Sequence, residues 1–394
     1  MTKSKYIPYG RQDIDSTDIN AVKKVLNSDF LTQGPEVENF EKEISKKVNA
    51  KYSISVNSAT SALHLACMAL EVGEKDIVWT SPNTFVASAN CALYCGAKID
   101  FVDIDISTNN ISVEKLEEKL ITAKKTGKLP KVVIVVHLTG RPCEMDKIYK
   151  LSKIYNFKII EDASHAIGAS YKKSLIGSCK WSDITVFSLH PVKIITSGEG
   201  GIICTNNKIL NKKCRLLRTH GITRNINDFK YKNQGLWHYE QHLLGYNYRM
   251  TDIHAALGKS QLRKIKSFIN KRNSIAKKYD HFFEDTHLEL PCIENKDYLV
   301  SSFHLYVIKL FHDDHIKNHK KIFKNLRKKG IGVNLHYSPV HLQPHYKKLG
   351  FSEGDFPNAE KYGKTAISIP IYPKLSLCDQ EYVVKSVVEE LKAV

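Results

Sequence analysis

The chain has 394 residues, 42% of them apolar, and carries 59 lysines and arginines against 41 aspartates and glutamates. This size allows one large α/β core with a smaller second unit, while no apolar run approaches the roughly 18 residues of a membrane span. Residues Met1 to Tyr6 lack the apolar segment of a secretory leader, so we expect a cytoplasmic protein with no membrane partner.

The formal net charge of +18 would suit nucleic acid, an anionic membrane or acidic small molecules. The basic residues are spread along helical stretches such as 264–278 and 317–329, without the interleaved aromatic residues that single-strand binding favours. We therefore interpret them as solvated helix faces and expect no nucleic-acid partner. A phosphorylated or nucleotide-linked ligand is compatible with this charge.

The cysteines do not predict a metal site. They are Cys67, Cys91, Cys95, Cys143, Cys179, Cys204, Cys214, Cys292 and Cys378. Their number is odd, and the spacing between Cys91 and Cys95 has no matching second pair of the kind that zinc sites use. We expect reduced, mostly buried thiols and no metal.

The first half of the chain has the pattern of an α/β protein. Residues 13–28 have helical periodicity, and turn formers at 29–35 end that helix. Strands are then predicted at 53–56, 76–81, 98–104, 131–137 and 157–162, with helices at 62–70, from 84, at 113–124 and at 144–155. This alternation predicts a mainly parallel sheet covered by helices on both faces.

Small hydroxyl residues, Asn57 to Ser61, join the first of these strands to its helix. A helix start of this kind presents free N–H groups at the positive end of the helix dipole, which suits a phosphate. Thr60 and Ser61 are equally suited to capping the helix and nothing more. Phe85, at the start of the next helix, could stack on a flat ring or fill the core.

Asp162 ends a predicted strand at the carboxyl edge, where open α/β sheets bind ligands. A carboxylate buried there needs a cationic partner. A protonated pyridinium nitrogen would serve, and His165 could orient the carboxylate or the ring. The alternative is that Asp162 caps a helix and His165 is a surface residue.

Lys193 follows an apolar run, 185–189, and precedes a glycine-rich turn that leads into a second apolar run. A partly desolvated lysine at a strand edge loses its proton more easily and can form a Schiff base with a carbonyl or with pyridoxal phosphate. Ser188 could donate to a phosphate oxygen. The competing interpretation is a solvated lysine, as for most basic residues of the chain.

The last third of the chain predicts a smaller unit. A polar and aromatic loop at 245–252 precedes a helix from Ile253 and a long basic helix to about 285. Strands are predicted at 302–310 and 331–337, and helices at 314–329, 356–367 and 379–392. This tail has an antiparallel α+β pattern.

Several motifs occur together in one order along the chain. They are Tyr9–Gln12, Asn57–His64, Thr84–Ala87, Glu161–His165, Ser188–Lys193, Glu199–Gly201, Arg218–Gly221 and Asn247–Arg249. In this combination the chain resembles the sugar aminotransferases of the DegT/DnrJ/EryC1/StrS family over nearly its whole length. The resemblance implies a fold-type I pyridoxal-phosphate (PLP) aminotransferase, with a large α/β PLP-binding domain over 13–260, a small α+β domain over 261–394, and residues 1–12 near the active site.

The resemblance also implies a role for each candidate site residue. Lys193 would be the Schiff-base lysine, Asp162 the partner of the pyridine nitrogen and Phe85 the ring that stacks on the cofactor, with His165 close by. The implied phosphate contacts are Ala59, Thr60, Ser188 and, from a second subunit, Asn247, so that a homodimer would share its active sites. The implied sugar contacts are Tyr9, Asp29, Phe30, Leu31, Thr32, His336 and Tyr337.

Three runs are most similar to the enzymes of pseudaminic acid biosynthesis: Leu31–Pro35, Asn57–His64 and Phe187–Lys193. This similarity implies transfer of an amino group from L-glutamate to the C4 ketone of UDP-2-acetamido-2,6-dideoxy-β-L-arabino-hexos-4-ulose, with pyridoxal 5'-phosphate as cofactor. The alternatives are an aminotransferase for another nucleotide-linked ketosugar, of the perosamine, viosamine or bacillosamine type, and a non-catalytic regulator on the same fold. Lys193 argues against a 3-dehydratase, which carries histidine at that position.

Overall fold

The structure, a computed structural model, describes residues 6–231, 235–291 and 298–394. Its centre is a seven-stranded sheet in the order β1-β9-β8-β5-β4-β2-β3. The strands are β1 (Tyr52–Val56), β2 (Ile77–Thr80), β3 (Lys98–Phe101), β4 (Val132–Val136), β5 (Lys158–Asp162), β8 (Ile184–Ser188) and β9 (Gly201–Thr205). Strand β9 runs opposite to its two neighbours, and the other neighbouring pairs are parallel. The mainly parallel sheet predicted from the sequence is confirmed.

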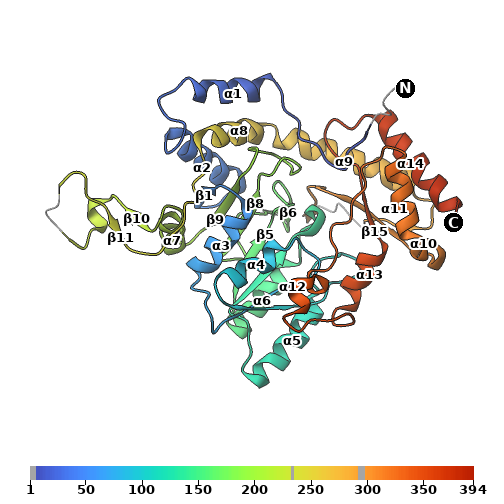
Figure 1. Ribbon diagram of the computed structural model, residues 1–394, viewed down its shortest axis with the longest axis horizontal. Helices are drawn as coiled ribbons and strands as arrows, with labels where there is room; N and C mark the ends of the chain where they lie inside the picture. Colours follow the sequence, from blue (N-terminus) through green and yellow to red (C-terminus); the bar gives the residue numbers. More distant parts are fainter. Residues whose placement is uncertain (1–5, 232–234, 292–297) are drawn as a thin grey trace.

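Helices cover both faces of this sheet (Figure 1). Successive residues of one strand point to opposite faces, so Val133 and Ile159 join one hydrophobic core while Ile134 and Ile160 join the other. The first core is covered by α2 (Pro35–Val48), α5 (Val113–Thr126), α6 (Met145–Tyr155), α8 (Asp252–Arg263) and α9 (Ile265–Phe282). The second is covered by α3 (Ala59–Ala69), α4 (Ala87–Tyr94), α7 (Lys208–Arg218) and α12 (Pro344–Lys347).

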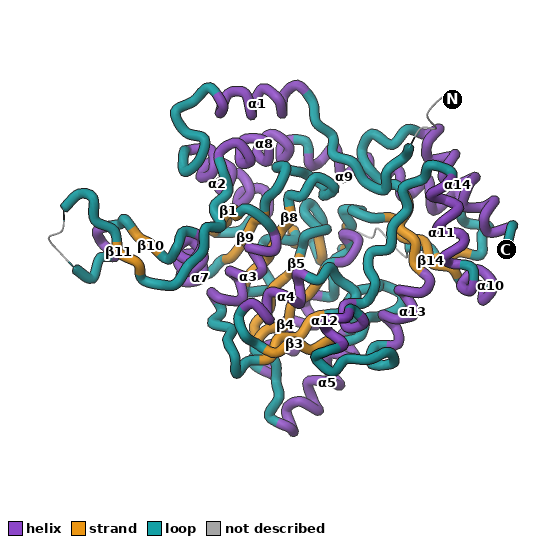
Figure 2. The backbone as a smooth tube through the Cα atoms, in the orientation of Figure 1, coloured by secondary structure: helices purple, strands orange, loops and turns teal. Residues whose placement is uncertain are grey.

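The C-terminal part has a core of its own, built on a three-stranded antiparallel sheet (Figure 2). Its strands are β12 (Leu288–Glu289), β14 (Tyr306–Leu310) and β15 (Ala366–Ile369). Its helices are α10 (Asp313–Lys317), α11 (His319–Lys328), α13 (Pro357–Thr365) and α14 (Leu377–Lys392). The N-terminal segment packs here, because Ile7 is buried in this core and pairs with Ile331.

The remaining elements are short, apart from α1 (Ser16–Leu26). They are β6 (Ser170–Tyr171), β7 (Ser174–Leu175), β10 (Ile222–Thr223), β11 (Glu240–Gln241) and β13 (Leu299–Val300), with 3-10 turns η1 (Leu138–Gly140), η2 (Ile226–Asp228) and η3 (Val340–Leu342). Strands β10 and β11 form an arm that projects from the body, at the left of Figure 1. No helix in the described ranges is long and apolar enough to cross a bilayer.

Three predictions about local structure need correction. The turn formers at 29–35 include the start of a helix that was not predicted: α2 begins at Pro35, because the fixed φ of proline suits the first helical turn. The strand predicted at 331–337 is wrong, since residues there make isolated bridges to Ile7 and Ser368. The strand predicted from 302 begins only at Tyr306, because Arg272 takes the carbonyl oxygens of the residues just before it.

The thiols are free in the described part of the chain. Six are buried, Cys95 is partly exposed and Cys378 is exposed. The prediction of mostly buried cysteines is therefore confirmed for these residues, and Cys292 lies outside the described residues.

Candidate active site

A cavity of about 690 Å³ opens at the carboxyl ends of β4, β5 and β8, where Val136, Asp162 and Ser188 line it. This is the edge at which parallel strands of an α/β sheet place their ligands. Ten of the predicted site residues line this one cavity. They are Tyr9, Ala59, Thr60, Phe85, Asp162, His165, Ser188, Lys193, His336 and Tyr337.

Asp162 is the last residue of β5 and is only 5% exposed. Ser88 Oγ on α4 donates to its Oδ2 at 2.6 Å, and the Ser164 N–H donates to its Oδ1 at 3.1 Å. Because residues 164–168 form turns, the alternative in which Asp162 caps a helix is wrong. The carboxylate is held on both oxygens and lines the cavity.

Lys193 lies in the turn between β8 and β9, and its side chain lines the cavity. Burial lowers the pKa of its ammonium group to about 8, and the nearby Asp162 carboxylate offsets part of that shift. A lysine with this pKa has an accessible neutral form near physiological pH, which an ordinary surface lysine lacks. Lys193 is thus a partly buried residue of the cavity wall, not a lysine on a solvated outer face.

The first turn of α3 forms a cradle of N–H groups at the cavity wall. Ser58 is the N-cap and accepts from the Ser61 N–H at 3.1 Å, so the capping role considered for Thr60 belongs to Ser58. Ala59 and Thr60 line the cavity at the positive end of the helix. A Cβ on Gly201 would lie 2.3 Å from the Ser58 carbonyl oxygen, so β9 approaches this turn as closely as glycine allows.

His165 is only 5% exposed, so its interpretation as a surface residue is wrong. Its Nε2 lies 3.3 Å from the Tyr337 hydroxyl, and its ring centroid lies 4.3 Å from that of His304. Burial, together with the Lys193 ammonium, holds the pKa of His165 well below its ordinary value. His165 is therefore a neutral imidazole that shares a hydrogen bond with the Tyr337 hydroxyl through Nε2.

His336 is neutral for the same reason. Burial, with a smaller contribution from Lys193, lowers its pKa to about 3. The Asn334 amide donates to Nε2 at 3.1 Å, so Nδ1 carries the proton and donates to Ser368 Oγ at 2.8 Å. Tyr9 packs against this ring, with centroids 4.9 Å apart. These side chains form an uncharged polar wall.

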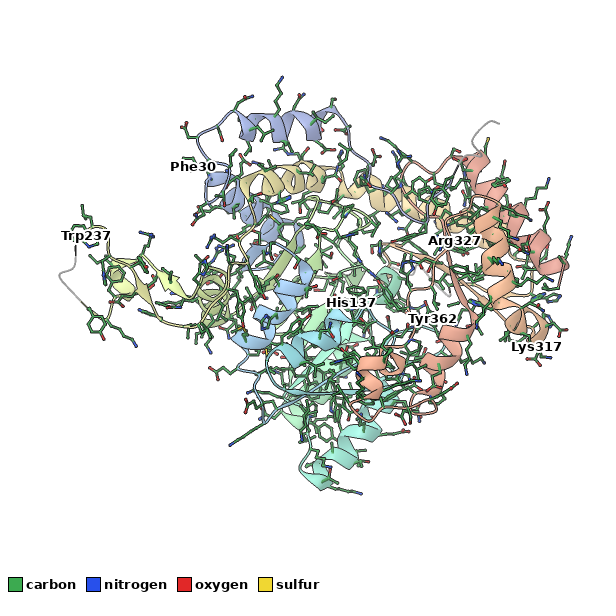
Figure 3. All side chains as sticks on the ribbon, in the orientation of Figure 1. Phe30, His137, Trp237, Lys317, Arg327 and Tyr362 are labelled. Carbon is green, nitrogen blue, oxygen red and sulfur yellow. The ribbon has the colours of Figure 1, made fainter. Side chains whose placement is uncertain are left out.

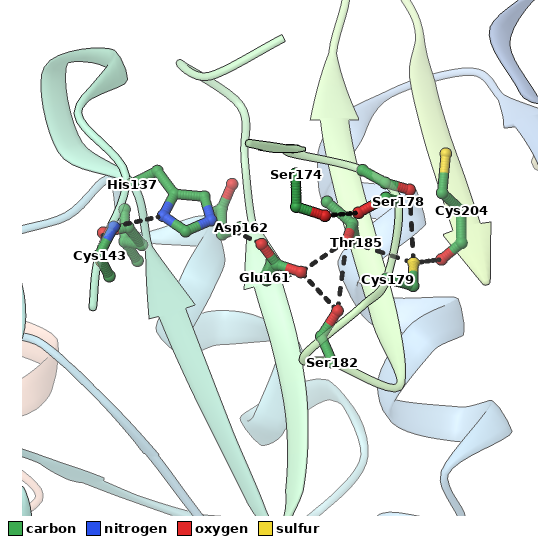
Figure 4. A network of polar contacts seen from close by, with 12 residues as sticks. His137, Cys143, Glu161, Asp162, Ser174, Ser178, Cys179, Ser182, Thr185 and Cys204 are labelled. Atoms are coloured by element: carbon green, nitrogen blue, oxygen red, sulfur yellow. Dashed lines mark hydrogen bonds and ion pairs between the residues drawn. The ribbon is translucent and has the colours of Figure 1, made fainter. Parts of the chain in front are cut away.

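A buried polar network supports β5 on the side away from Asp162 (Figure 4). The Cys143 N–H donates to His137 Nδ1 at 3.0 Å, so the imidazole donates from Nε2 to Glu161 at 2.8 Å. Ser182 and Thr185 also donate to Glu161. Burial alone would raise the pKa of Glu161, but these bonds bring it below its ordinary value. The network holds Glu161 in place on β5, and Asp162 is the next residue of that strand.

Five predicted site residues do not line this chain's cavity. They are Asn247 and the loop of Asp29, Phe30, Leu31 and Thr32. Phe30 and Leu31 are 54% and 48% exposed, and Phe30 lies at the outer edge of the molecule (Figure 3). Asn247 is exposed as well. Thr32 pairs with Thr251, four residues beyond Asn247, so the two segments are neighbours.

Sequence reasoning missed three polar contributors. Ser88 bonds Asp162, His304 packs on His165, and Asn334 orients His336. In the sequence Ser88 is one of several small residues between Ala87 and Ala92, a pattern that is typical of closely packed helices. His304 and Asn334 lie in the predicted strands 302–310 and 331–337. Alternation along a strand shows which side chains share a face, but it does not show whether that face lines a cavity or the core.

Comparison with known proteins agrees with this geometry. Residues 12–388 match the DegT/DnrJ/EryC1/StrS aminotransferase family. The chain belongs to this family. It is 41% identical, over 98% of each chain, to the UDP-4-amino-4,6-dideoxy-N-acetyl-beta-L-altrosamine transaminase of Campylobacter jejuni. The structure of Helicobacter pylori PseC, an aminotransferase involved in the biosynthesis of pseudoaminic acid, superposes with a TM-score of 0.89 at 30% identity, covering 99% of this chain and 100% of PseC.

Pyridoxal phosphate is the cofactor of this family, and the residues that line the cavity fit it. Spr1654 of Streptococcus pneumoniae, solved in PLP and PMP forms, is 29–30% identical, with TM-scores of 0.88 and 0.90. The PMP form matches over 98% of this chain and 100% of its own. In this chain the cavity offers an amine of lowered pKa, a fixed carboxylate, an exposed aromatic ring at Phe85 and the N–H cradle of α3. Each matches one part of that cofactor: its aldehyde, ring nitrogen, ring face and phosphate.

Proposed function

We propose that this family member transfers the amino group of L-glutamate to the C4 ketone of a UDP-linked 4-keto-6-deoxy-N-acetylhexosamine, in pseudaminic acid biosynthesis. The observation that carries the chemistry is Lys193, with its lowered pKa, in the same cavity as the fixed carboxylate of Asp162. The substrate rests on the names of the C. jejuni and H. pylori relatives.

Lys193 is the group that moves the proton. Pyridoxal phosphate, when bound, supplies an aldehyde that holds the amino group and a ring that takes up the electron pair released beside it. With a pKa of about 8, roughly a tenth of Lys193 is neutral at pH 7, against about 0.04% for a lysine at 10.4. Its Nζ could therefore accept a proton from the carbon of the substrate and return it to the carbon of the cofactor.

Asp162 would hold the ring nitrogen of the bound cofactor in its protonated form. Two hydrogen bonds fix its oxygens, from Ser88 and from the Ser164 N–H, so the carboxylate is oriented before the cofactor binds. His165, held neutral by burial, adds no competing charge beside it. Ala59, Thr60 and Ser188 would receive the phosphate through the N–H groups of the helix start and a hydroxyl.

A homodimer accounts for the five predicted residues outside the cavity. Asn247 and the loop Asp29–Thr32 are exposed neighbours, joined by the bridge between Thr32 and Thr251. We propose that both complete the partner subunit's site, Asn247 at the phosphate and the loop at the sugar. Tyr9, His336 and Tyr337 would contact the sugar from the chain's own cavity. The division into domains at 260/261 and the cytoplasmic location belong to the same proposal.

The test is the absorbance spectrum of the purified protein followed by turnover. A band at about 420 nm that moves to about 330 nm on adding L-glutamate in the wild type, and is absent in Lys193→Ala, is the expected result. The glutamate-treated enzyme should then convert the UDP-linked 4-ketosugar to an amine detectable by mass spectrometry. A wild type without the band, even after pyridoxal phosphate is added, would overturn the mechanism. Turnover of only a different nucleotide-linked ketosugar would overturn the substrate.

A further inference from the structure

Arg272 is a buried arginine that the mechanism above does not use. It lies on α9 and is 1% exposed. In the described part of the chain its hydrogen bonds go to backbone carbonyl oxygens and none goes to a carboxylate. Burial lowers the pKa of its guanidinium group to about 9, so the group stays charged at neutral pH. A buried charge without a carboxylate is costly, and a side chain that only filled the core would be apolar.

Three carbonyl oxygens accept from the Nη1 group of Arg272. Those of Phe303 and His304 lie at 3.1 Å each, and that of Ile371 lies at 3.0 Å. Phe303 has a φ of 45°, a conformation that bulky residues adopt rarely and that the surrounding structure must hold. The arginine thus joins α9 to two segments that are far apart in sequence.

The first of these segments supports His165. The ring centroid of His304 lies 4.3 Å from that of His165, and Ser302 Oγ donates to the His165 carbonyl oxygen at 2.6 Å. His165 in turn shares a hydrogen bond with the Tyr337 hydroxyl, and both side chains line the cavity. Because Arg272 holds the His304 carbonyl oxygen, it fixes the residue against which the His165 ring packs.

The second segment supports Tyr9. The Ile371 carbonyl oxygen accepts from Arg272, while the Ile371 N–H donates to the Tyr9 carbonyl oxygen at 3.0 Å. The Tyr9 ring packs on that of His336, with centroids 4.9 Å apart, and both side chains line the cavity. We call the four cavity residues that these two segments support the aromatic wall: Tyr9, His165, His336 and Tyr337.

The reacting groups are held by other bonds. Asp162 is fixed by Ser88 and by the Ser164 N–H, and Lys193 lies in the turn between β8 and β9. The two bonds to Asp162 do not involve Arg272 or its three acceptors. A change at Arg272 should therefore displace the aromatic wall and leave Lys193 and Asp162 in place.

We propose that Arg272 is a positioning residue that holds the aromatic wall in the arrangement that receives the sugar of the nucleotide-linked substrate. This inference rests on the proposed function, which places the sugar against three residues of that wall. Arg272 lies outside the cavity lining and acts through the backbone at His304 and Ile371. Because its guanidinium group is planar and rigid, it holds both segments in one relation, which the flexible ammonium group of a lysine does not.

The experiment compares Arg272→Lys with a matched control, Tyr279→Phe. Tyr279 is also buried on α9, and its hydroxyl donates to the Pro370 carbonyl oxygen at 2.8 Å, one residue before Ile371. Both variants lose bonding from the same helix to the same segment, but only Arg272 holds Ile371 and His304. Rapid mixing of each holoenzyme measures the L-glutamate half-reaction and the ketosugar half-reaction separately, at the cofactor band.

We expect a split between binding and rate. In Arg272→Lys the ketosugar concentration at half-maximal rate should rise about tenfold, because a displaced wall binds the sugar less well, while the maximal rates of both half-reactions stay within about twofold of the wild type. Tyr279→Phe should match the wild type in all of these values. An unchanged ketosugar concentration, an equal loss in both maximal rates, or the same rise in Tyr279→Phe would overturn the proposal.

Two further measurements cover a variant that does not fold and a substrate that is wrong. His304→Leu keeps Arg272 and removes only the ring on His165; because His304 Nδ1 has no hydrogen-bond partner, an apolar side chain fits there. It should raise the ketosugar concentration as Arg272→Lys does, and a wild-type value would overturn the proposal. Deuterium exchange needs no substrate: the Ile371 N–H should exchange faster in Arg272→Lys than in Tyr279→Phe, and equal exchange would also overturn it. Faster exchange in a protein that does not aminate the UDP-linked ketosugar would contradict the proposed substrate instead.

Discussion

Replacing Ser88 with alanine removes one of the two hydrogen bonds that hold the Asp162 carboxylate. The Ser88 hydroxyl is 0% exposed and donates to Asp162 Oδ2 at 2.6 Å. A hydrogen bond to a charged group is worth about 1.5–3 kcal/mol, which corresponds to about 10- to 150-fold in rate. Because the Ser164 N–H still holds Oδ1 at 3.1 Å, we expect the lower end, an approximately tenfold slower reaction with L-glutamate.

The assay is rapid mixing of Ser88→Ala holoenzyme with L-glutamate, followed at the cofactor band. The matched control is Ser152→Ala on α6: Ser152 is 5% exposed and donates to the Tyr149 carbonyl oxygen at 2.7 Å, so the same atom is deleted from a buried site away from the cavity. The control should react at the wild-type rate. A wild-type rate in Ser88→Ala, with cofactor bound, would refute the role given to this hydrogen bond.

Three further predictions address the interface, the lysine and the phosphate cradle. Mixed Lys193→Ala and Asn247→Ala proteins should regain about a quarter of wild-type activity after subunit exchange, because half of the dimers are mixed and each has one intact site; no recovery would place Asn247 in its own subunit's site. Because burial lowers the pKa of Lys193 to about 8 from 10.5, the neutral amine increases as pH rises, and the rate at which apoenzyme captures pyridoxal phosphate should rise with a midpoint near pH 8. A midpoint near 10 would contradict the burial argument. Gly201→Ala places a Cβ 2.3 Å from the Ser58 carbonyl oxygen, and we expect a loss of about 1–3 kcal/mol in the free energy of unfolding and weaker cofactor binding. In the control Gly73→Ala the Cβ meets nothing within 4 Å, so an equal loss in both variants, measured by urea titration, would reject the close-approach argument.

The fold class could be predicted because parallel strands buried on both faces are short apolar runs, and Val132–Val136 is one such run. Helix α2 was missed because glycine and proline occur both just after helix ends and at helix starts, so Gly34 and Pro35 alone do not show which applies. Residues 331–337 have the pattern of a strand, but single bridges to Ile7 and Ser368 take the place of a ladder. Pattern predicts which face is buried, not which partner is available.

The site could be predicted only in part for a similar reason. Asp162 ends one apolar strand and Lys193 lies in the turn after another, so their positions at one sheet edge follow from the order of elements. The bond from Ser88 to Asp162 joins helix α4 to strand β5, and no local pattern encodes a contact between residues so distant in sequence. Asn247 has a role in the proposal only when a second copy is present, which the sequence of one chain does not specify.

The backbone hydrogen bonds that join the N-terminal segment to the C-terminal unit affect when the cavity can form during synthesis. The Gly332 N–H donates to the Ile7 carbonyl oxygen at 2.7 Å, and the Ile371 N–H donates to that of Tyr9 at 3.0 Å. Tyr9 lines the cavity, but it leaves the ribosome more than 300 residues before its partner Ile371. The central sheet can form during synthesis, whereas this wall of the cavity closes only once residue 371 is free. Incomplete translation products therefore lack a finished substrate pocket even when their sheet is folded.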